Sequence, residues 1–380
     1  MHKQDWVVYK KNILANLKRV VIKIGSAVLT NDSGLDLKVI TRLADDISSL
    51  HERKIDVVLV SSGAVAAGLK KLSFQSKKFN LIQKQALSAI GQSRLMYVYD
   101  KTFANFSKIT AQVLLTRQDL CSRERFLNAR NTLHQLLRWQ VIPIVNENDT
   151  VAIQELTFGD NDQLAVMVLN LVEADLLLNL TSAQGVFDKN PLQFPQAKRL
   201  RVIEDILALD LDKLCQGKTE TGTGGMYSKL LAAKRAAQLG VPTVILPGKE
   251  RFVLERLFQG EDLGTWILPQ GKKVSRRKFW LAYNLEPEGQ IWIDSGAVTA
   301  LKKGKSLLPV GIKKIKGSFQ RGSLVKIADE KDNVIGAGLC NYNSQEVEQI
   351  KGKHSSEIDA VRFPWQEVIH ADNLLLDVFF

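Results

Sequence analysis

The sequence contains few cysteines, and their scarcity argues against a fold held together by disulfides. Cys121, Cys215 and Cys340 are the three cysteines in 380 residues, and they match neither a disulfide framework nor the paired spacing of a metal site. This usage predicts a protein of the reducing cytoplasm. The N-terminal segment lacks a sustained apolar core and a small-residue cleavage site, so we expect no signal peptide.

Histidine and long apolar runs are also scarce. The chain has five histidines, and none lies in the turns discussed below, which disfavours general-base catalysis by imidazole. The most apolar stretch, residues 164–180, is interrupted by Glu173 and Asp175, so it does not predict a membrane-spanning helix. We therefore expect a cytoplasmic protein without a membrane partner.

The residues that are present are typical of a globular protein. Hydrophobic residues make up 45% of the chain and charged residues 24%, and a length of 380 residues predicts about two domains. The formal net charge is +12, with basic clusters at residues 272–278 and 302–316. This charge suits nucleic acid, a membrane surface, small anionic ligands or a plain solvated surface, and it does not choose among them.

Up to about residue 248, short apolar runs alternate with amphipathic segments. The runs are RVVIKI from residue 19, IDVVLV from 55, QVLLT from 112, VIPIV from 141, ADLLLNLT from 174 and VPTVIL from 241. This alternation predicts an α/β fold, a mainly parallel sheet covered on both faces in an αβα sandwich. Ligands of such folds bind beyond the carboxyl ends of the strands.

The pattern changes after about residue 269. A basic link is followed by short runs broken by glycines, GQIWIDSG, LLPVGI, GSLVKIAD and VIGAGLCNY. Regular short strands with turn signals predict a second, smaller β-rich domain, with barrel character. We expect the boundary between residues 269 and 283.

Two lysines lie where a phosphate would be held. Lys23 lies two residues before Gly25, at the end of a strand predicted to be buried, and Lys229 lies in the first turn of a helix that follows TGTGG. Alone, each has an ordinary explanation, a lysine reaching solvent or a flexible glycine loop. Together, glycine amides, a helix N-terminus and two ammonium groups suit a polyphosphate, although the spacing is not that of a P-loop.

Acidic and amide residues follow two other predicted strands. GDND, residues 159–162, precedes an apolar helix, and its carboxylates are either helix caps or groups that orient the lysines and a divalent cation. Asn146, Asn148 and Asp149 follow VIPIV, and Asp149 suits the ammonium of a small substrate. A substrate carboxylate is already ionised and needs no general base, so phosphoryl transfer to a carboxylate is a coherent hypothesis.

The order of the motifs resembles the glutamate 5-kinases, a branch of the amino acid kinase family. The resemblance rests on KIGSAVLT, VSSGAVAAG, GQSRLM, LLTRQDL, RERFLNARNTL, IPIVNENDTVA, FGDNDQLAVMV and GTGGMYSKLLAA. The segments WIDSGAVTAL, KGKSLLPVGI, RGSLVKI and EIDAV resemble a PUA domain. These motifs extend over most of the chain.

The resemblance implies ATP-dependent phosphorylation of the side-chain carboxylate of L-glutamate to L-glutamyl 5-phosphate, the first step of proline biosynthesis. It also implies Mg²⁺, a homo-oligomer and feedback inhibition by proline. The implied domains are a catalytic amino acid kinase domain (1–270), a linker (271–283), a PUA domain (284–366) and a C-terminal tail (367–380). Few aromatic residues accompany the lysines of the PUA segment, so we expect RNA binding there to be weak.

The resemblance also implies roles for individual residues. Lys23, Lys229 and Asp162 are the implied catalytic residues, and Asp162 is also the implied magnesium-binding residue. The implied substrate-binding residues are Ser62, Asp149, Asn161 and Asp160. The implied ATP-binding residues are Lys23, Thr181, Ser182, Thr223, Gly224, Gly225, Met226, Tyr227, Ser228 and Lys229.

One segment departs from the family pattern. The family's LLTD before GLY reads NLTSAQGVF here, with Ser182 in place of the aspartate and Phe187 in place of the tyrosine. Serine can accept or donate one hydrogen bond but carries no charge, so the charged nucleotide contact of the family is absent at Ser182. Two alternatives stay open, an amino acid kinase acting on another carboxylate or phosphate, and an RNA-binding protein whose kinase half is degenerate.

Overall fold

The computed structural model describes residues 3–73, 79–152, 161–215, 225–269 and 273–376. The chain forms two compact units, Met1–Lys273 and Val274–Phe380. Within the described residues, no helix combines the length and the apolar character that a membrane-spanning segment needs.

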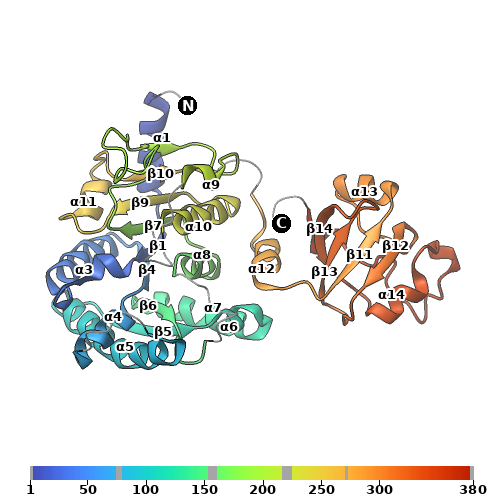
Figure 1. The fold of residues 1–380 in the computed structure, drawn as a ribbon, viewed down its shortest axis with the longest axis horizontal. Helices are drawn as coiled ribbons and strands as arrows, with labels where there is room; N and C mark the ends of the chain where they lie inside the picture. Colours follow the sequence, from blue (N-terminus) through green and yellow to red (C-terminus); the bar gives the residue numbers. More distant parts are fainter. Residues whose placement is uncertain (1–2, 74–78, 153–160, 216–224, 270–272, 377–380) are drawn as a thin grey trace. The chain divides into compact units, whose positions relative to one another are not determined.

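The first unit is built on an eight-stranded sheet in the described residues, with the order β5-β6-β4-β1-β7-β9-β10-β8 (Figure 1). All neighbours are parallel except β9 and β10. The strands are β1 (Arg19–Ile24), β4 (Asp56–Ser61), β5 (Thr110–Leu115), β6 (Ile142–Glu147), β7 (Leu176–Thr181), β8 (Val202–Ile203), β9 (Thr243–Pro247) and β10 (Thr265–Ile267). The predicted mainly parallel sheet is confirmed.

Helices cover both faces of this sheet (Figure 1). They are α1 (Lys3–Ala15), α2 (Ser26–Leu29), α3 (Leu37–Glu52), α4 (Ala64–Leu72), α5 (Leu81–Ala104), α6 (Arg117–Cys121), α7 (Arg123–Arg138), α8 (Asn161–Val172), α9 (Leu211–Leu214), α10 (Met226–Gln238) and α11 (Val253–Phe258). A small hairpin, β2 (Thr30–Asn31) and β3 (Gly34–Leu35), precedes α3.

Side-chain alternation in the central strand β1 decides which face carries polar groups. Ile22 and Ile24 are fully buried in the hydrophobic core that also contains residues of α3, α5 and α11. Because successive side chains of a strand point to opposite faces, Lys23 points to the other face, on which α8 packs. Asn179 of β7 lies beside Lys23 in the parallel register, so both polar side chains lie on this face.

The second unit contains a five-stranded sheet in its described part, with the order β12-β11-β13-β14-β15. Its elements are α12 (Arg276–Asn284), β11 (Gly289–Ile293), α13 (Ser295–Lys302), β12 (Ile312–Lys316), β13 (Leu324–Ala328), β14 (Val334–Leu339), α14 (Ser344–Ile350) and β15 (Leu374–Leu376). The predicted second, smaller β-rich domain is confirmed, and within the described residues its sheet has β12 and β15 at the two ends of the strand order. A core of its own includes Ile291, Phe319 and Val325.

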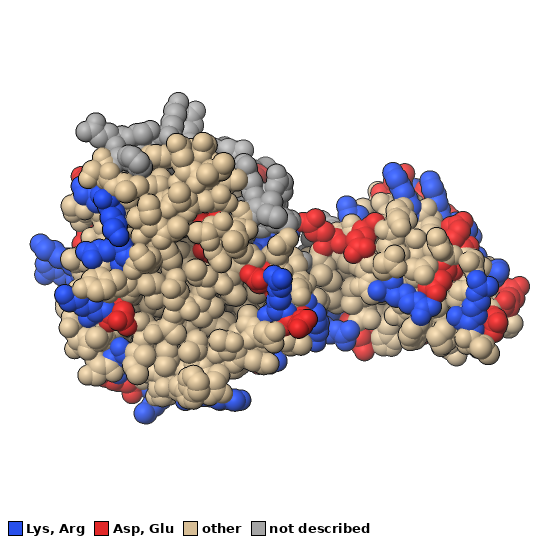
Figure 2. All heavy atoms as spheres, turned by 90° about the horizontal axis from the view of Figure 1, so that it is seen from below, with Lys and Arg blue, Asp and Glu red and all other residues tan. Residues whose placement is uncertain are grey.

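Charged residues are spread over the surface. On the face that Figure 2 shows, basic side chains are interspersed with acidic ones and with uncharged surface. The formal charge of +12 is therefore not concentrated in one patch on this face. This spacing favours the solvated-surface explanation for much of the net charge.

Candidate functional site

Polar side chains gather at the carboxyl ends of β1, β4, β6 and β7. This is the edge where ligands bind in parallel α/β sheets, and the chain order changes direction around β1, which has β4 on one side and β7 on the other. Lys23 comes from β1, and Lys229 comes from the first turn of α10. Both are buried, with 2% and 6% of their surface exposed.

Asp162, in the first turn of α8, joins the two lysines. Its Oδ1 lies 2.6 Å from Lys23 Nζ, and its Oδ2 lies 3.0 Å from Lys229 Nζ. Asn179 Nδ2 donates to Oδ1 at 2.8 Å, and Ser228 Oγ donates to Oδ2 at 2.7 Å. Asp162 is fully buried. One carboxylate therefore contacts two ammonium groups, one on each of its oxygens.

A second polar cluster surrounds Asn161, the residue before Asp162. Asn161 Nδ2 lies 2.9 Å from Ser62 Oγ, 2.9 Å from Asn146 Oδ1 and 3.0 Å from the carbonyl oxygen of Ser61. The Nδ2 of Asn146 in turn donates to Gln92 Oε1 of α5 at 2.9 Å. Residues from four elements are thus brought together beside the two lysines, because Asn161 and Asp162 are adjacent in the chain.

Asp149 lies just after β6, where α5 packs close to the strand end. Ser88 Oγ of α5 donates to Asp149 Oδ2 at 2.5 Å. Burial raises the pKa of the Asp149 carboxyl above its ordinary value, and the hydrogen bond from Ser88 lowers that pKa in part. The carboxylate is therefore shielded from water, so an ammonium ligand would interact with it strongly.

Glycines and a helix N-terminus border the lysines. Gly25 lies directly after β1, and its amide donates to the carbonyl of Leu180. A Cβ added to Gly25 would lie 4.0 Å from Lys23 Nζ. Gly25 caps α2, and Gly225 caps α10, the helix that carries Lys229. Backbone amides at helix starts and nearby ammonium groups favour an anion.

The other predicted nucleotide residues are distributed as follows. Thr181, at the end of β7, is buried, whereas Ser182 is exposed immediately after it. Met226 and Ser228 are half-buried, and Tyr227 is 41% exposed. The predicted site residues Asp160, Thr223 and Gly224 lie outside the described residues. The structure therefore brings together Lys23, Lys229, Asp162, Asn161 and Ser62.

Sequence reasoning missed several residues of these clusters. Asn179 binds Asp162, Gln92 binds Asn146, and Ser88 binds Asp149. A signal was present for Asn179, because an asparagine inside the apolar run LLLNLT is costly to bury without a partner. Gln92 and Ser88 lie in a long helix whose contacts with distant strand ends depend on tertiary packing, so the sequence carries no local signal for them.

Family models match both parts of the chain. The amino acid kinase family model matches residues 18–247, and the PUA domain model matches residues 289–362. Among solved structures, the UMP kinase of Bacillus anthracis is 17% identical, with a TM-score of 0.47, over 67% of this chain and 97% of that protein.

Curated relatives match over nearly the full length. A protein of Maridesulfovibrio salexigens named glutamate 5-kinase is 58% identical over 367 residues, 96% of this chain and 97% of that protein. A protein of the same name from Nitratidesulfovibrio vulgaris is 55% identical over 378 residues, 98% of this chain and 99% of that protein. The chain therefore belongs to the amino acid kinase family.

Proposed function

We propose that this chain transfers the γ-phosphoryl group of ATP to the side-chain carboxylate of L-glutamate. The product would be L-glutamyl 5-phosphate, in the first step of proline biosynthesis. The observation that carries the proposal is the buried pair Lys23 and Lys229, held by Asp162 at the carboxyl end of the central strand. Relatives that are 58% and 55% identical over nearly their whole length carry the name glutamate 5-kinase, which supports this substrate.

We assign the phosphates of ATP to the two lysines. Their ammonium groups lie on opposite oxygens of one carboxylate, so they can contact different phosphoryl oxygens at once. The amides at the start of α10 and the turn at Gly25 add donors to the same region. The remaining proposed nucleotide contacts are Thr181, Ser182, Thr223, Gly224, Gly225, Met226, Tyr227 and Ser228.

We assign glutamate to the second polar cluster. Asp149 would receive the substrate ammonium, and the hydroxyl of Ser62 and the amide of Asn161 would bind substrate oxygens. The 2.9 Å distance between Ser62 Oγ and Asn161 Nδ2 supports a shared role for these two groups. Asp160 is proposed as a further contact. In this assignment the glutamate side chain would lie beside the lysines, since Asn161 precedes Asp162.

The chemistry follows from positioning and charge. A side-chain carboxylate oxygen of glutamate forms a bond to the γ-phosphorus, while the bond to the β,γ-bridging oxygen breaks and ADP leaves with that electron pair. The nucleophile is already ionised, so no general base is needed. Lys23 and Lys229 would neutralise charge on the transferred group and on the leaving group, a term worth about 3 kcal/mol or more for one well-placed donor.

Mg²⁺ would enter with ATP as part of the substrate complex. In the described part of the chain, no three His, Cys, Asp or Glu side chains gather to hold an ion. Both oxygens of Asp162 already accept from protein donors, which fits the orienting role of this carboxylate better than direct ligation. We therefore assign Asp162 to the two lysines and leave the cation to the phosphate oxygens.

The test is an assay of the full chain with ATP, Mg²⁺ and glutamate, in which hydroxylamine traps the acyl phosphate and ADP release is followed in parallel. We expect glutamate-dependent formation of both products. Lys229→Ala should reduce turnover by about a hundredfold or more, because it removes charge stabilisation in the transition state. Lys234→Ala, on the same helix, is the matched control. Turnover with a different carboxylate but not with glutamate would overturn the assignment.

The same proposal includes the expected partners and location. We propose that the protein acts as a homo-oligomer, that proline competes for the glutamate site, and that RNA binding by the second unit is weak. We also propose a cytoplasmic location, supported by a sequence with three cysteines that match no disulfide framework. Proline shares the α-carboxylate and an ammonium with glutamate but has no side-chain carboxylate to phosphorylate. It should therefore raise the apparent KM for glutamate.

A further inference from the structure

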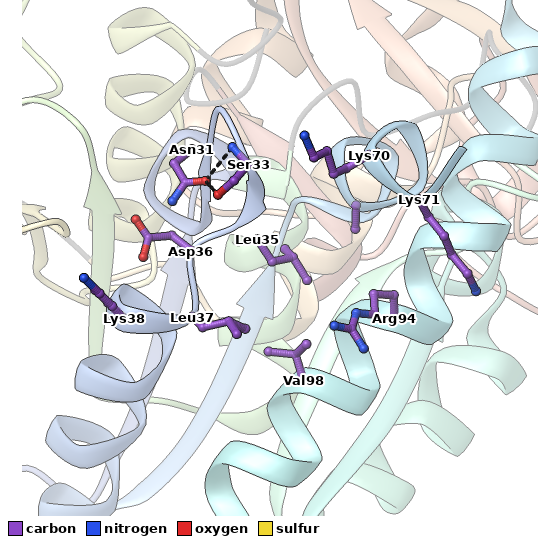
Figure 3. Close-up of a pocket in the computed structure, with 11 residues that line it drawn as sticks. Asn31, Ser33, Leu35, Asp36, Leu37, Lys38, Lys70, Lys71, Arg94 and Val98 are labelled. Atoms are coloured by element: carbon purple, nitrogen blue, oxygen red, sulfur yellow. Dashed lines mark hydrogen bonds between the residues drawn. The ribbon is translucent and has the colours of Figure 1, made fainter. Parts of the chain in front are cut away.

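A cavity of about 970 Å³ lies beside the hairpin β2–β3, and we name it the hairpin pocket (Figure 3). We propose that the hairpin pocket binds a small phosphate monoester whose organic part is apolar. Its lining residues are Asn31, Ser33, Leu35, Asp36, Leu37, Lys38, Ala67, Lys70, Lys71, Arg94 and Val98. This volume lies within the range of small-molecule sites.

The hairpin pocket is distinct from the proposed active site. Its walls come from the hairpin, the start of α3, the last turns of α4 and the middle of α5. Lys23, Lys229 and Asp162 do not line it. Helix α4 begins next to Ser62 of the proposed glutamate site, and Lys70 lies near its other end. An anion bound at Lys70 would therefore occupy different side chains from those assigned to ATP and glutamate.

The lining carries an excess of positive charge. The lining contains one acidic residue, Asp36, and four basic residues, Lys38, Lys70, Lys71 and Arg94. The carboxylate of Asp36 accepts from the amide of Val39 at 3.2 Å and caps α3. Among the described residues, none of the four basic side chains forms an ion pair. Cations that line a cavity without carboxylate partners raise the local concentration of anions.

We assign the phosphate to two of these cations, Arg94 and Lys70. In Figure 3, the guanidinium of Arg94 points toward the space bordered by Leu35, Leu37 and Val98, whereas Lys38 points away from it. Lys70 lines the pocket from α4, and its Nζ is directed to the hairpin, where it lies 3.5 Å from the carbonyl oxygen of Asp32. A planar guanidinium and an ammonium on neighbouring helices are the donors that a phosphate dianion prefers, the first by paired hydrogen bonds and the second as a point charge.

The floor of the pocket explains why the ligand should have an apolar part. Leu35, Leu37, Ala67 and Val98 line it, and Leu37 is 53% exposed. An exposed leucine beside cations offers apolar surface to a ligand held by its charge. Inorganic phosphate would leave this surface in water, whereas an ester with a ring or a short hydrocarbon would cover it.

The hairpin that forms one wall is held in place. Gly34 has a φ of +108°, a conformation that L side chains rarely adopt, and an added Cβ would lie 2.9 Å from Lys70 Cγ. The aliphatic stem of Lys70 therefore packs directly on the hairpin backbone. Asn31 Oδ1 accepts from both the amide of Ser33, at 2.9 Å, and its hydroxyl, at 2.6 Å. The pocket is thus formed before any ligand arrives.

The test is isothermal titration of the full chain with phenyl phosphate, which is a phosphate dianion with an apolar ring. The test variant combines Arg94→Gln with Lys70→Gln, and both positions are exposed, so the fold should tolerate the changes. Lys101→Gln is the matched control, because Lys101 is an exposed cation on α5 outside the lining. All three proteins keep Lys23 and Lys229, so any binding at the proposed active site is common to them.

We expect the double variant to bind phenyl phosphate at least about tenfold more weakly than the wild type at the hairpin pocket, and the control to bind as the wild type does. Equal isotherms for the wild type and the double variant would overturn the proposal. Equal weakening in the control would also overturn it, because it would indicate diffuse surface charge. A parallel titration with inorganic phosphate should show weaker binding than with the ester, and equal affinity would refute the role of the apolar floor.

Discussion

Asp162 shows how a single buried carboxylate can organise two cations. Breaking a buried ion pair leaves an uncompensated charge, which is strongly destabilising, so the ion pairs with Asp162 help to keep Lys23 and Lys229 buried. Among the described residues, each oxygen of the carboxylate contacts one ammonium group and accepts from one neutral donor. The positions of the ammonium groups are therefore set before a phosphate binds, as electrostatic preorganisation requires.

Asn179 should matter for turnover more than for stability. Its Nδ2 donates to Asp162, but its buried Oδ1 has no hydrogen-bond partner in the described residues, which costs about 1–3 kcal/mol. Asn179→Leu removes both the donor and the unsatisfied acceptor. We expect kcat to fall by about tenfold, because Asp162 loses one orienting bond, while the thermal unfolding midpoint stays equal or rises. Loss of stability in parallel with kcat would contradict this positioning role.

Ser88 should influence the pH below which glutamate binding weakens. Burial raises the pKa of Asp149, and the bond from Ser88 lowers it again in part, so Ser88→Ala should raise the pKa further. An ammonium binds the ionised carboxylate, and that form is lost as the pH falls through the raised pKa. The KM for glutamate should therefore begin to rise at a higher pH in Ser88→Ala than in the wild type. Ser93→Ala, at an exposed position of the same helix, is the control.

Charged residues beside apolar runs could be predicted from the sequence as site residues. Lys23 at the end of an apolar run and Asp162 at the head of an apolar helix are both expensive to bury, and the structure places them 2.6 Å apart. Ser88 had no such context, because a serine in a helix is ordinary. Its partner Asp149 is 61 residues away, so only the packing of α5 on the strand ends relates the two.

At the scale of elements, helices α4 and α5 cross at unusually close range. Gly68 and Gly91 lie at the crossing, where a Cβ on Gly91 would lie 1.7 Å from the carbonyl oxygen of Ala64. A Cβ on Gly68 would lie 2.0 Å from the carbonyl oxygen of Leu87. No side chain fits against backbone at these distances. The close crossing brings Gln92 and Ser88 of α5 to the ends of the strands that they contact.

Gly91→Ala should therefore destabilise the first unit. Alanine favours a helix by about 1 kcal/mol over glycine, but the clash with backbone atoms of α4 outweighs that gain, and we expect a net loss of about 3 kcal/mol in the free energy of unfolding. Urea denaturation followed by circular dichroism measures the change. Ser93→Ala on the exposed side of α5 should be nearly neutral. An unchanged urea midpoint in Gly91→Ala would show that the helices move apart without cost.

Long apolar strands were predictable, whereas the shortest ones were not. The runs from residues 19, 55, 112, 141, 174 and 241 each overlap a strand of the large sheet. Strands β2, β3 and β8 have two residues each, too few to show any alternation. Strand β15 lies within residues 367–380, which we expected to be a tail, and pairs with β14. Its three leucines form a short apolar run with no turn signal beside it, so the sequence pattern did not predict a strand there.

At the scale of the whole molecule, the two units have separate cores. One described core runs from Leu17 to Leu268, and another from Ile291 to Leu374. Helix α12 belongs with the second unit, where Lys278 Nζ donates to the carbonyl of Ala371 and Arg277 donates to Asn373 Oδ1. All the residues assigned to ATP and glutamate lie between Lys23 and Lys229. The proposed chemistry therefore rests on side chains of the first unit alone.

A chain truncated after Lys273 should consequently fold and keep glutamate-dependent turnover. The cut leaves the eight-stranded sheet intact and removes α12 together with the sheet that it contacts. We expect kcat within about threefold of the full chain, since loss of one interaction made only in the transition state costs far more. The measurement is the hydroxylamine-trapping assay, with circular dichroism as the control for folding. A truncated chain that is fully folded but inactive would show that the second unit supplies part of the catalytic machinery.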